Sequence, residues 1–229
     1  MIICHKHKFI FVKTQKTAST SIEIALSGLC AATDILTPIS TNDENYRKSL
    51  GFQTATNFVI PFGKYTKHDY LELLISGKRK ELYNHMSCAE IKNFVGSKVF
   101  RSYYKFCFER NPYEKLISLF YHQGGYKKWP TIEAFIKAGE LNIIKGFDQY
   151  TINKVVAVDD VFKLENLDGA LSIISNKLSL DSKLELPKVK LKSNFRKDKR
   201  SYKEILTPVD RQMVDIIWAR ERELMDYKY

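Results

Sequence analysis

The stretch HKFIFVKTQKTASTSIEIAL, residues 7–26, decides the fold that the sequence predicts. Residues 9–12 form an apolar run that is typical of a short buried strand. A lysine- and hydroxyl-rich loop, residues 13–21, comes next, and apolar side chains then recur at helical spacing. A strand, a loop and a helix in this order direct backbone N–H groups and the positive end of a helix dipole at the loop. The stretch therefore predicts a site for an anion such as phosphate or sulfate.

The side chains of this loop also favour an anion, because Lys16 supplies a mobile cation. Hydroxyl donors stand beside it on Thr17, Ser19, Thr20 and Ser21. The loop is not a standard phosphate-binding loop, since no glycine precedes Gly28, so the small side chains of Ala18 and Ser19 have to permit close backbone approach. Taken alone, the segment fits an ordinary capped helix beside a solvated lysine equally well.

Length and composition indicate one globular domain over residues 1–229. No apolar run reaches the length of a membrane-spanning helix, and the start of the chain has no signal-peptide pattern. We therefore expect a cytoplasmic protein without an integral membrane segment. Four scattered cysteines favour free thiols over a disulfide framework. The Cys4-His5-Lys6-His7 tract has no matching ligands elsewhere, so we predict no metal site.

The net charge of +11 leaves three classes of anionic partner open: nucleic acids, membrane surfaces, and small anions or glycans. Basic residues are dispersed along the chain except in residues 188–200, where they are dense. A solvated loop is the simpler interpretation of that segment. No zinc-finger, RRM or KH signature is present, so we expect no nucleic-acid partner. The sequence does not indicate the oligomeric state.

Strand and helix patterns alternate along the rest of the chain. Further strands are expected at residues 58–60, 104–109, 155–158 and 161–164. Helices are expected at residues 67–76, 87–95, 132–138, 167–178 and 208–225, and one more begins at Pro112. Residues 31–57 have the composition of a polar loop. The alternation predicts an α/β fold with a mainly parallel central sheet flanked by helices.

A second strand, turn and helix, FCFERNPYEKLISLFYH, covers residues 106–122. Alternation puts Phe106, Phe108 and Arg110 on one side, and Arg110 falls at the carboxyl end of the strand, where α/β folds place groups that bind ligands. Ser118 lies about two helical turns further on, so it can face the same crevice. A guanidinium group and a hydroxyl suit a second phosphate.

Together the two segments resemble the carbohydrate sulfotransferases that use 3′-phosphoadenosine 5′-phosphosulfate (PAPS), in particular the branch of heparan sulfate 2-O-sulfotransferase and its bacterial relatives. The resemblance implies a P-loop-like nucleotide-binding fold in which residues 16–21, KTASTS, hold the 5′-phosphosulfate. It further implies that Arg110 and Ser118 bind the 3′-phosphate. A basic loop closes over the nucleotide elsewhere in the family, which suggests Lys197 and Arg200 as additional contacts.

The resemblance extends to a histidine segment, NHMSCAEIK at residues 84–92, and implies that His85 is the general base. The unperturbed pKa of histidine lies near working pH, which suits the removal of a hydroxyl proton. A structural hydrogen bond is the alternative role, and His68 and His122 are weaker candidates for the base. Glu109 stands where the family usually has an apolar residue. Because it alternates away from Arg110, we expect it to have a lysine partner.

The predicted reaction moves the sulfuryl group of PAPS to an acceptor hydroxyl and releases 3′-phosphoadenosine 5′-phosphate (PAP). Lys16 neutralises the leaving phosphate in this scheme, and no metal is required because side chains supply the cations. The basic surface favours a glycan or glycolipid acceptor. Two alternatives stay open. One is a nucleoside or small-molecule kinase with a degenerate phosphate loop, in which Asp159 and Asp160 could hold Mg²⁺. The other is a non-catalytic basic protein that binds glycans or nucleic acids.

Overall fold

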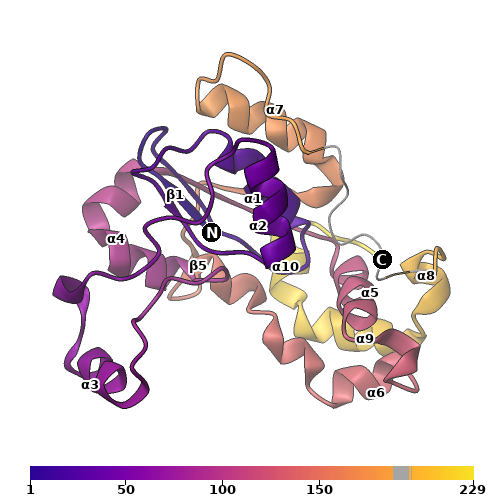
Figure 1. Ribbon diagram of the computed structural model, residues 1–229. Helices are drawn as coiled ribbons and strands as arrows, with labels where there is room; N and C mark the ends of the chain where they lie inside the picture. Colours follow the sequence, from indigo (N-terminus) through magenta and orange to yellow (C-terminus); the bar gives the residue numbers. More distant parts are fainter. Residues whose placement is uncertain (188–195, 197) are drawn as a thin grey trace.

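Five strands of the described residues form the central sheet, in the order β3-β1-β2-β4-β7 (Figure 1). The computed structural model describes residues 1–187, 196 and 198–229. The strands are β1 (Ile2–Cys4), β2 (Phe9–Phe11), β3 (Ile35–Leu36), β4 (Tyr104–Glu109) and β7 (Asp160–Lys163). β2, β4 and β7 pair in parallel, whereas β1 runs antiparallel to both β2 and β3.

The sheet is therefore mixed, and the prediction of a mainly parallel sheet is wrong at the edge formed by β1 and β3. The sequence pattern misses β1 because its apolar run has only three residues. A short turn, residues 5–8, folds this strand back onto β2 as a hairpin. Lys8 ends the turn with a left-handed backbone, at φ 52°.

Helices cover both faces of the sheet, and a further group of helices packs together beyond one end of it. They are α1 (Ser19–Ser27), α2 (Thr41–Ser49), α3 (Lys67–Ser76), α4 (Cys88–Ser102), α5 (Pro112–His122), α6 (Ile132–Lys137), α7 (Leu167–Lys177), α8 (Tyr202–Ile205), α9 (Pro208–Ile217) and α10 (Ala219–Leu224). Two short strands, β5 (Thr151–Ile152) and β6 (Val155–Val156), form a separate ribbon. The chain is thus an α/β protein with a mixed central sheet flanked by helices.

Alternation along the strands divides the core into two layers. Phe106 and Phe108 of β4 pack with residues of α1 and α7 on one face of the sheet. Cys107, between them, packs with residues of α4 on the other face. Figure 1 shows α7 and α4 on opposite sides of the sheet. A third cluster joins α5, α6 and α9 through residues such as Phe120 and Trp218, and it supports α5 beyond the end of β4.

Several predicted elements differ from the observed ones. Residues 31–57, which were expected to be a polar loop, contain β3 and α2, and α2 buries the side chain of Arg47. The helix expected to end near residue 95 does end there, because Gly96 is non-helical (φ 82°, ψ 157°), but a second helical segment of α4, up to Ser102, was not predicted. The helix expected over residues 208–225 is broken at Trp218. Residues 58–60 make one isolated bridge, from Val59 to Glu81. β6 lies outside the main sheet.

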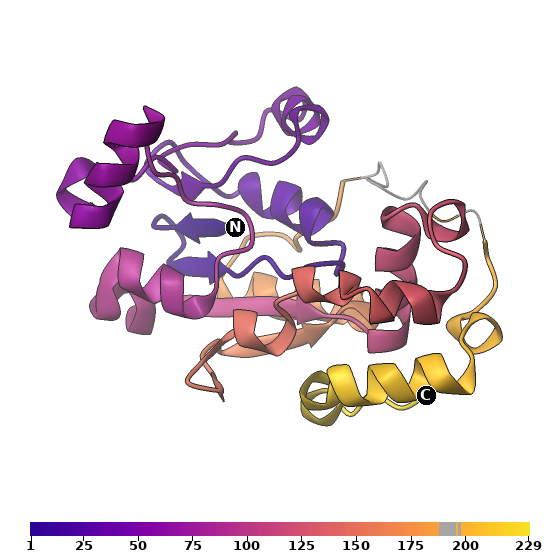
Figure 2. The ribbon, with the colours of Figure 1, turned by 90° about the horizontal axis from the view of Figure 1, so that it is seen from below.

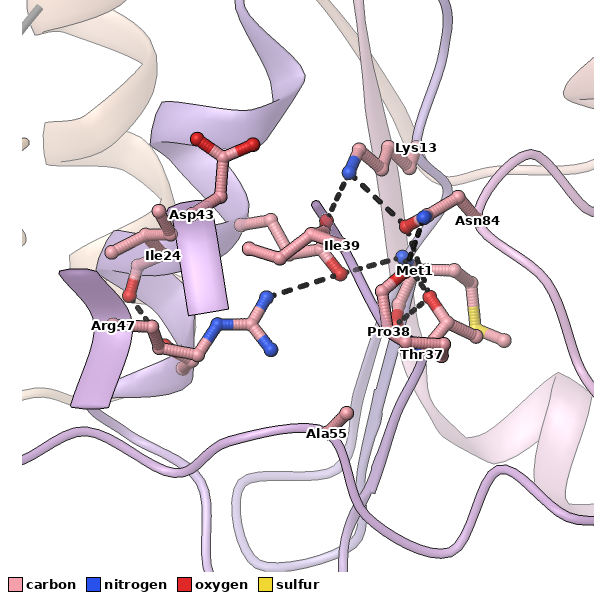
Figure 3. Close-up of polar contacts among 12 residues, drawn as sticks. Met1, Lys13, Ile24, Thr37, Pro38, Ile39, Asp43, Arg47, Ala55 and Asn84 are labelled. Atoms are coloured by element: carbon pink, nitrogen blue, oxygen red, sulfur yellow. Dashed lines mark hydrogen bonds and ion pairs between the residues drawn. The ribbon is translucent and has the colours of Figure 1, made fainter. Parts of the chain in front are cut away.

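A buried carboxylate on α1 ties the first loop to α2. Glu23 is fully buried and pairs with Lys13 at 2.5 Å and with Arg47 at 3.5 Å, and it also accepts a hydrogen bond from the Met1 nitrogen. Figure 3 shows the side chains of Lys13, Arg47 and Asn84 in this region, with Asn84 beside Lys13. Burial alone would raise the pKa of Glu23, but the surrounding cations hold it at about 2.

Replacing Glu23 by glutamine is expected to lower the free energy of unfolding by about 3–5 kcal/mol, because it leaves the buried cations of Lys13 and Arg47 without their counter-charge. The folded pKa lies below the unfolded value of 4.5, so the stabilisation is present above that value and is lost as pH falls towards 2. Urea unfolding at several pH values checks both effects. A loss below about 1 kcal/mol would show that the cluster contributes little.

The four cysteines are free thiols, as predicted, and Cys4, Cys88 and Cys107 are buried. Within the described residues, no helix combines the length and the apolar character needed to cross a membrane.

Candidate active site

One cleft of about 420 Å³ collects most of the predicted site residues. It lies where β2 and β4 end, between the start of α1, the body of α5 and the chain around His85. The predicted residues that line it are Lys16, Ala18, Ser19, Thr20, Ser21, His85, Arg110 and Ser118. These side chains come from three segments that are far apart in the sequence. The cleft sits at the carboxyl ends of parallel strands, which is the usual ligand position in α/β folds.

The backbone of the first loop is arranged to expose N–H groups. Lys16 and Ala18 both have left-handed backbones, at φ 63° and 53°, which is uncommon for residues other than glycine. Ala18 is the N-cap of α1 and offers no side-chain acceptor to the first turn. The N–H groups of Ser19 and Thr20 make no hydrogen bond to another described residue. Such a loop before a helix start forms a concave surface suited to an anion.

Thr17 is the exception among the predicted loop residues. Its side chain is fully buried, and its hydroxyl is within 3.0 Å of the Thr14 hydroxyl. Thr14 in turn donates a hydrogen bond to the carbonyl of Phe108, which anchors the loop to β4. The Thr17 hydroxyl therefore holds the loop in place and does not line the cleft.

Arg110 and Ser118 meet in the cleft because α5 begins immediately after β4. Asn111 caps the helix by accepting hydrogen bonds from two backbone N–H groups of its first turn, and Pro112 occupies the first helical position. The Arg110 guanidinium pairs with Glu114 at 3.3 Å. Glu114 also pairs with Arg196 at 3.1 Å, which brings a second guanidinium close to Arg110.

The basic segment gives a mixed result. Lys197 lies outside the described residues. Arg200 is exposed, pairs with Asp198 at 2.7 Å and does not line the cleft. Arg196, which the sequence analysis did not single out, is instead the arginine of this segment that reaches Glu114 beside the cleft. No motif signals it, because the loop has no periodic pattern.

His85 is fixed in one tautomer by its surroundings. Its Nδ1 lies 2.8 Å from the carbonyl oxygen of Lys13, and a carbonyl only accepts, so Nδ1 carries the proton. The Nε2 atom of the neutral ring is then the basic nitrogen. Burial lowers the pKa of His85 to about 4, although the bond to the Lys13 carbonyl acts in the opposite direction. The expectation of an ordinary histidine pKa is therefore wrong, and the ring is neutral at pH 7.

Two further residues, Asn84 and Gln15, also shape the cleft, and the sequence analysis assigned a role to neither. Asn84 accepts hydrogen bonds from Lys13 and Thr37, both at 3.1 Å, and so holds the segment before His85 (Figure 3). The amide oxygen of Gln15 accepts from the Lys145 N–H at 2.9 Å, and its amide nitrogen donates to the Ile143 carbonyl. This contact fixes the wall of residues 143–144 against the loop.

A family model described as the sulfotransferase family matches residues 1–155, which include the first loop, His85, Arg110 and Ser118. The chain belongs to the sulfotransferase family. An uncharacterized protein of Archaeoglobus fulgidus is 33% identical over 104 residues, which are 42% of this chain and 84% of that protein. No solved structure matches the chain significantly.

The charges around the cleft suit an anionic ligand. The described residues that line the cleft include the cations Lys16 and Arg110 and no aspartate or glutamate. Glu109, at the end of β4, is buried and pairs with Lys115, which confirms the predicted lysine partner. His122 of α5 lines the cleft as well, whereas His68 belongs to α3 and does not.

Proposed function

We propose that this sulfotransferase moves the sulfuryl group of PAPS to a hydroxyl of an acceptor. The observation that carries the proposal is that the first loop, Arg110 and Ser118 line the same cleft. PAPS carries two separate anionic groups, the 5′-phosphosulfate and the 3′-phosphate. The loop with Lys16 supplies donors for the first group, and the Arg110 guanidinium with the Ser118 hydroxyl suits the second.

In this mechanism, Lys16 stabilises the departure of PAP. The acceptor oxygen attacks sulfur, a new S–O bond forms, and the bond from sulfur to the bridging phosphate oxygen breaks. Negative charge then grows on that bridging oxygen. A lysine ammonium and preorganised N–H groups stabilise such charge when they are aimed at it in a partly desolvated site. Lys16 and the backbone of residues 18–20 are the groups of this chain that can act in that way.

His85 takes the acceptor proton. Its Nε2 is the basic nitrogen, because Nδ1–H is bound to the Lys13 carbonyl. Proton removal as the O–S bond forms makes the hydroxyl a better nucleophile. The neutral ring of His85 is available for this step at pH 7, and its lowered pKa makes it a weaker base than an ordinary histidine. The products are the sulfated acceptor, PAP and a protonated His85, which returns its proton to solvent.

The kinase alternative is disfavoured by the positions of its candidate metal ligands. Asp159 pairs with Lys105 at 2.8 Å, and Asp160 pairs with Lys177 at 2.6 Å. Asp160 begins β7, so it lies at the amino end of a parallel strand, whereas the cleft lies at the carboxyl ends. A Mg²⁺-dependent kinase needs an acidic ligand beside the transferred phosphate.

A glycan or glycolipid hydroxyl is the acceptor class we propose, as in the heparan sulfate 2-O-sulfotransferase-like branch. Transfer of labelled sulfate from PAPS to a panel of glycans, glycolipids and small alcohols tests the reaction directly. Label in at least one carbohydrate product supports the proposal. Binding of glycans or nucleic acids without transfer to any acceptor would favour the non-catalytic basic protein instead.

The role of Arg110 gives a prediction about nucleotide selectivity. Arg110→Ala is expected to weaken PAP binding by about 10–100-fold, because a charge-assisted contact to the 3′-phosphate is lost. Binding of adenosine 5′-phosphate, which lacks that group, is expected to change little. Calorimetry with both nucleotides measures the preference, and Arg101→Ala on α4 is the matched control. Equal losses for both nucleotides would assign Arg110 a structural role through Glu114.

A further inference from the structure

The outer face of α3 is the most exposed aliphatic surface among the described helices. Leu74 and Ile75 are 83% and 78% exposed, and Leu71 is 54% exposed. Spacings of three and four residues put all three side chains on one face of the helix. Figures 1 and 2 both show α3 at the periphery, away from the central sheet. Contiguous apolar surface of this kind marks interaction sites in proteins.

The orientation of α3 is set by its opposite face. Asp69 is buried, closes a capping box with Thr66 and pairs with Lys80 at 2.5 Å. Gly77 ends the helix in a left-handed conformation, at φ 67°. These contacts fix the inner face of the helix. Leu74 and Ile75 are largely exposed, so the packing of the helix does not depend on them.

An aromatic cluster at the base of α3 gives it a firm support. Phe62, Tyr65 and Tyr70 contact one another, and the Tyr70 hydroxyl donates to the Phe62 carbonyl at 3.0 Å. The Arg79 guanidinium lies 4.5 Å from the centre of the Phe62 ring. Phe62 and Tyr70 are themselves about half exposed, so aromatic and aliphatic side chains share this outer region.

Charge at the two ends of the helix indicates the kind of partner. Lys67 starts α3 four residues before Leu71, and Lys78 follows the last turn. Both lysines are exposed, and neither forms an ion pair with a described acidic residue. An aliphatic stripe with lysines at its ends, on a chain of net charge +11, complements an anionic lipid surface. The most exposed side chains of the helix are aliphatic, Leu74 and Ile75, whereas protein-binding hot spots are rich in tryptophan, tyrosine and arginine.

We propose that α3 docks this protein onto anionic bilayers. Leu74 and Ile75 enter the boundary between headgroups and acyl chains, and Lys67 and Lys78 contact lipid phosphates. The binding is peripheral and reversible, because the buried apolar area is that of a few side chains. This docking surface is independent of the cleft and of the reaction proposed for it.

Co-sedimentation with vesicles tests the docking surface. The protein is expected to bind vesicles of phosphatidylcholine mixed with phosphatidylserine and to bind phosphatidylcholine alone far more weakly. Leu74→Ser with Ile75→Ser is expected to weaken binding about tenfold or more. Lys67→Gln with Lys78→Gln is expected to weaken it about fivefold for each lysine, and less as salt is raised.

Matched pairs of control variants separate this surface from general stickiness. Ile216→Ser with Ile217→Ser removes exposed aliphatic residues from α9, and Lys48→Gln with Lys127→Gln removes two exposed lysines elsewhere. Both control pairs are expected to bind vesicles nearly as the unchanged protein does. Equal losses in control and α3 variants would overturn the proposal. So would a dimer in sedimentation velocity that the α3 serine variant converts to monomer while vesicle binding persists.

Discussion

Replacing Lys16 by alanine is expected to reduce sulfuryl transfer by about 10³-fold or more. Lys16 lines the cleft at the start of α1 and is the loop cation that can meet the charge growing on the leaving phosphate. Cations that act on a transferring group at this point contribute rate factors of that order. Turnover of PAPS at saturating acceptor measures the effect. Turnover within about tenfold of normal would contradict the leaving-group role.

Lys8 provides a matched control for this variant. Both lysines have left-handed backbones, at φ 52° for Lys8 and 63° for Lys16. Alanine in place of either keeps the same backbone strain, so the two variants are expected to change stability similarly. Lys8 lies in the exposed turn between β1 and β2, away from the cleft. Only Lys16→Ala is expected to lose activity, which separates loss of the charge from damage to the backbone.

Removing the imidazole of His85 is expected to lower kcat by about 10²–10⁴-fold while PAP affinity stays within about threefold. The residue supplies a base, and PAP has no proton for it to remove. His85→Asn retains an N–H near the Nδ1 position, which can still donate to the Lys13 carbonyl. This variant is expected to bind PAP normally and to remain inactive. His122→Ala, in the same cleft, is the control for the histidine of α5. Parallel losses of kcat and PAP affinity would make His85 a structural residue.

The lowered pKa of His85 predicts the acidic limb of the pH profile. A base acts in its neutral form, so kcat/KM is expected to stay level as pH falls past the usual histidine value of 6.5 and to decline as it approaches 4. The same shift affects stability. Because the folded pKa lies below the unfolded one, the contribution of neutral His85 is present above 6.5 and is lost as pH falls towards 4. An acidic limb centred near 6.5 would contradict the burial of this ring.

The fold could be predicted where periodicity and capping residues agree, and not elsewhere. β2 and β4 are central apolar strands, and the Asn111-Pro112 pair marked the start of α5. β1 was missed because strand pairing, and not its short sequence, makes it a strand. α2 was missed because its polar surface carries no apolar stripe, although it buries Arg47 against Glu23. Tertiary charge pairing of this kind leaves no periodic signal.

The site could be predicted in its residues but not in its details. The loop and the Arg110 motif lie almost a hundred residues apart in the sequence, and the parallel pairing of β2 with β4 brings them together. The left-handed backbone of Ala18 depends on the whole loop, so it could not be predicted from the residue type at that position. The tautomer of His85 depends on its contact with the Lys13 carbonyl. Because every residue has a carbonyl group, the sequence does not indicate which one a histidine contacts. The link from Glu114 to Arg196 crosses from α5 to a loop without a pattern.

Calorimetry with PAP, in the presence and absence of Mg²⁺, tests most directly whether the cleft is built for PAPS. The two-phosphate arrangement of the first loop with Arg110 and Ser118 predicts tight PAP binding that does not depend on Mg²⁺ and exceeds the binding of adenosine 5′-phosphate. Weak PAP binding together with tight, Mg²⁺-dependent binding of ATP would contradict the account and favour a kinase.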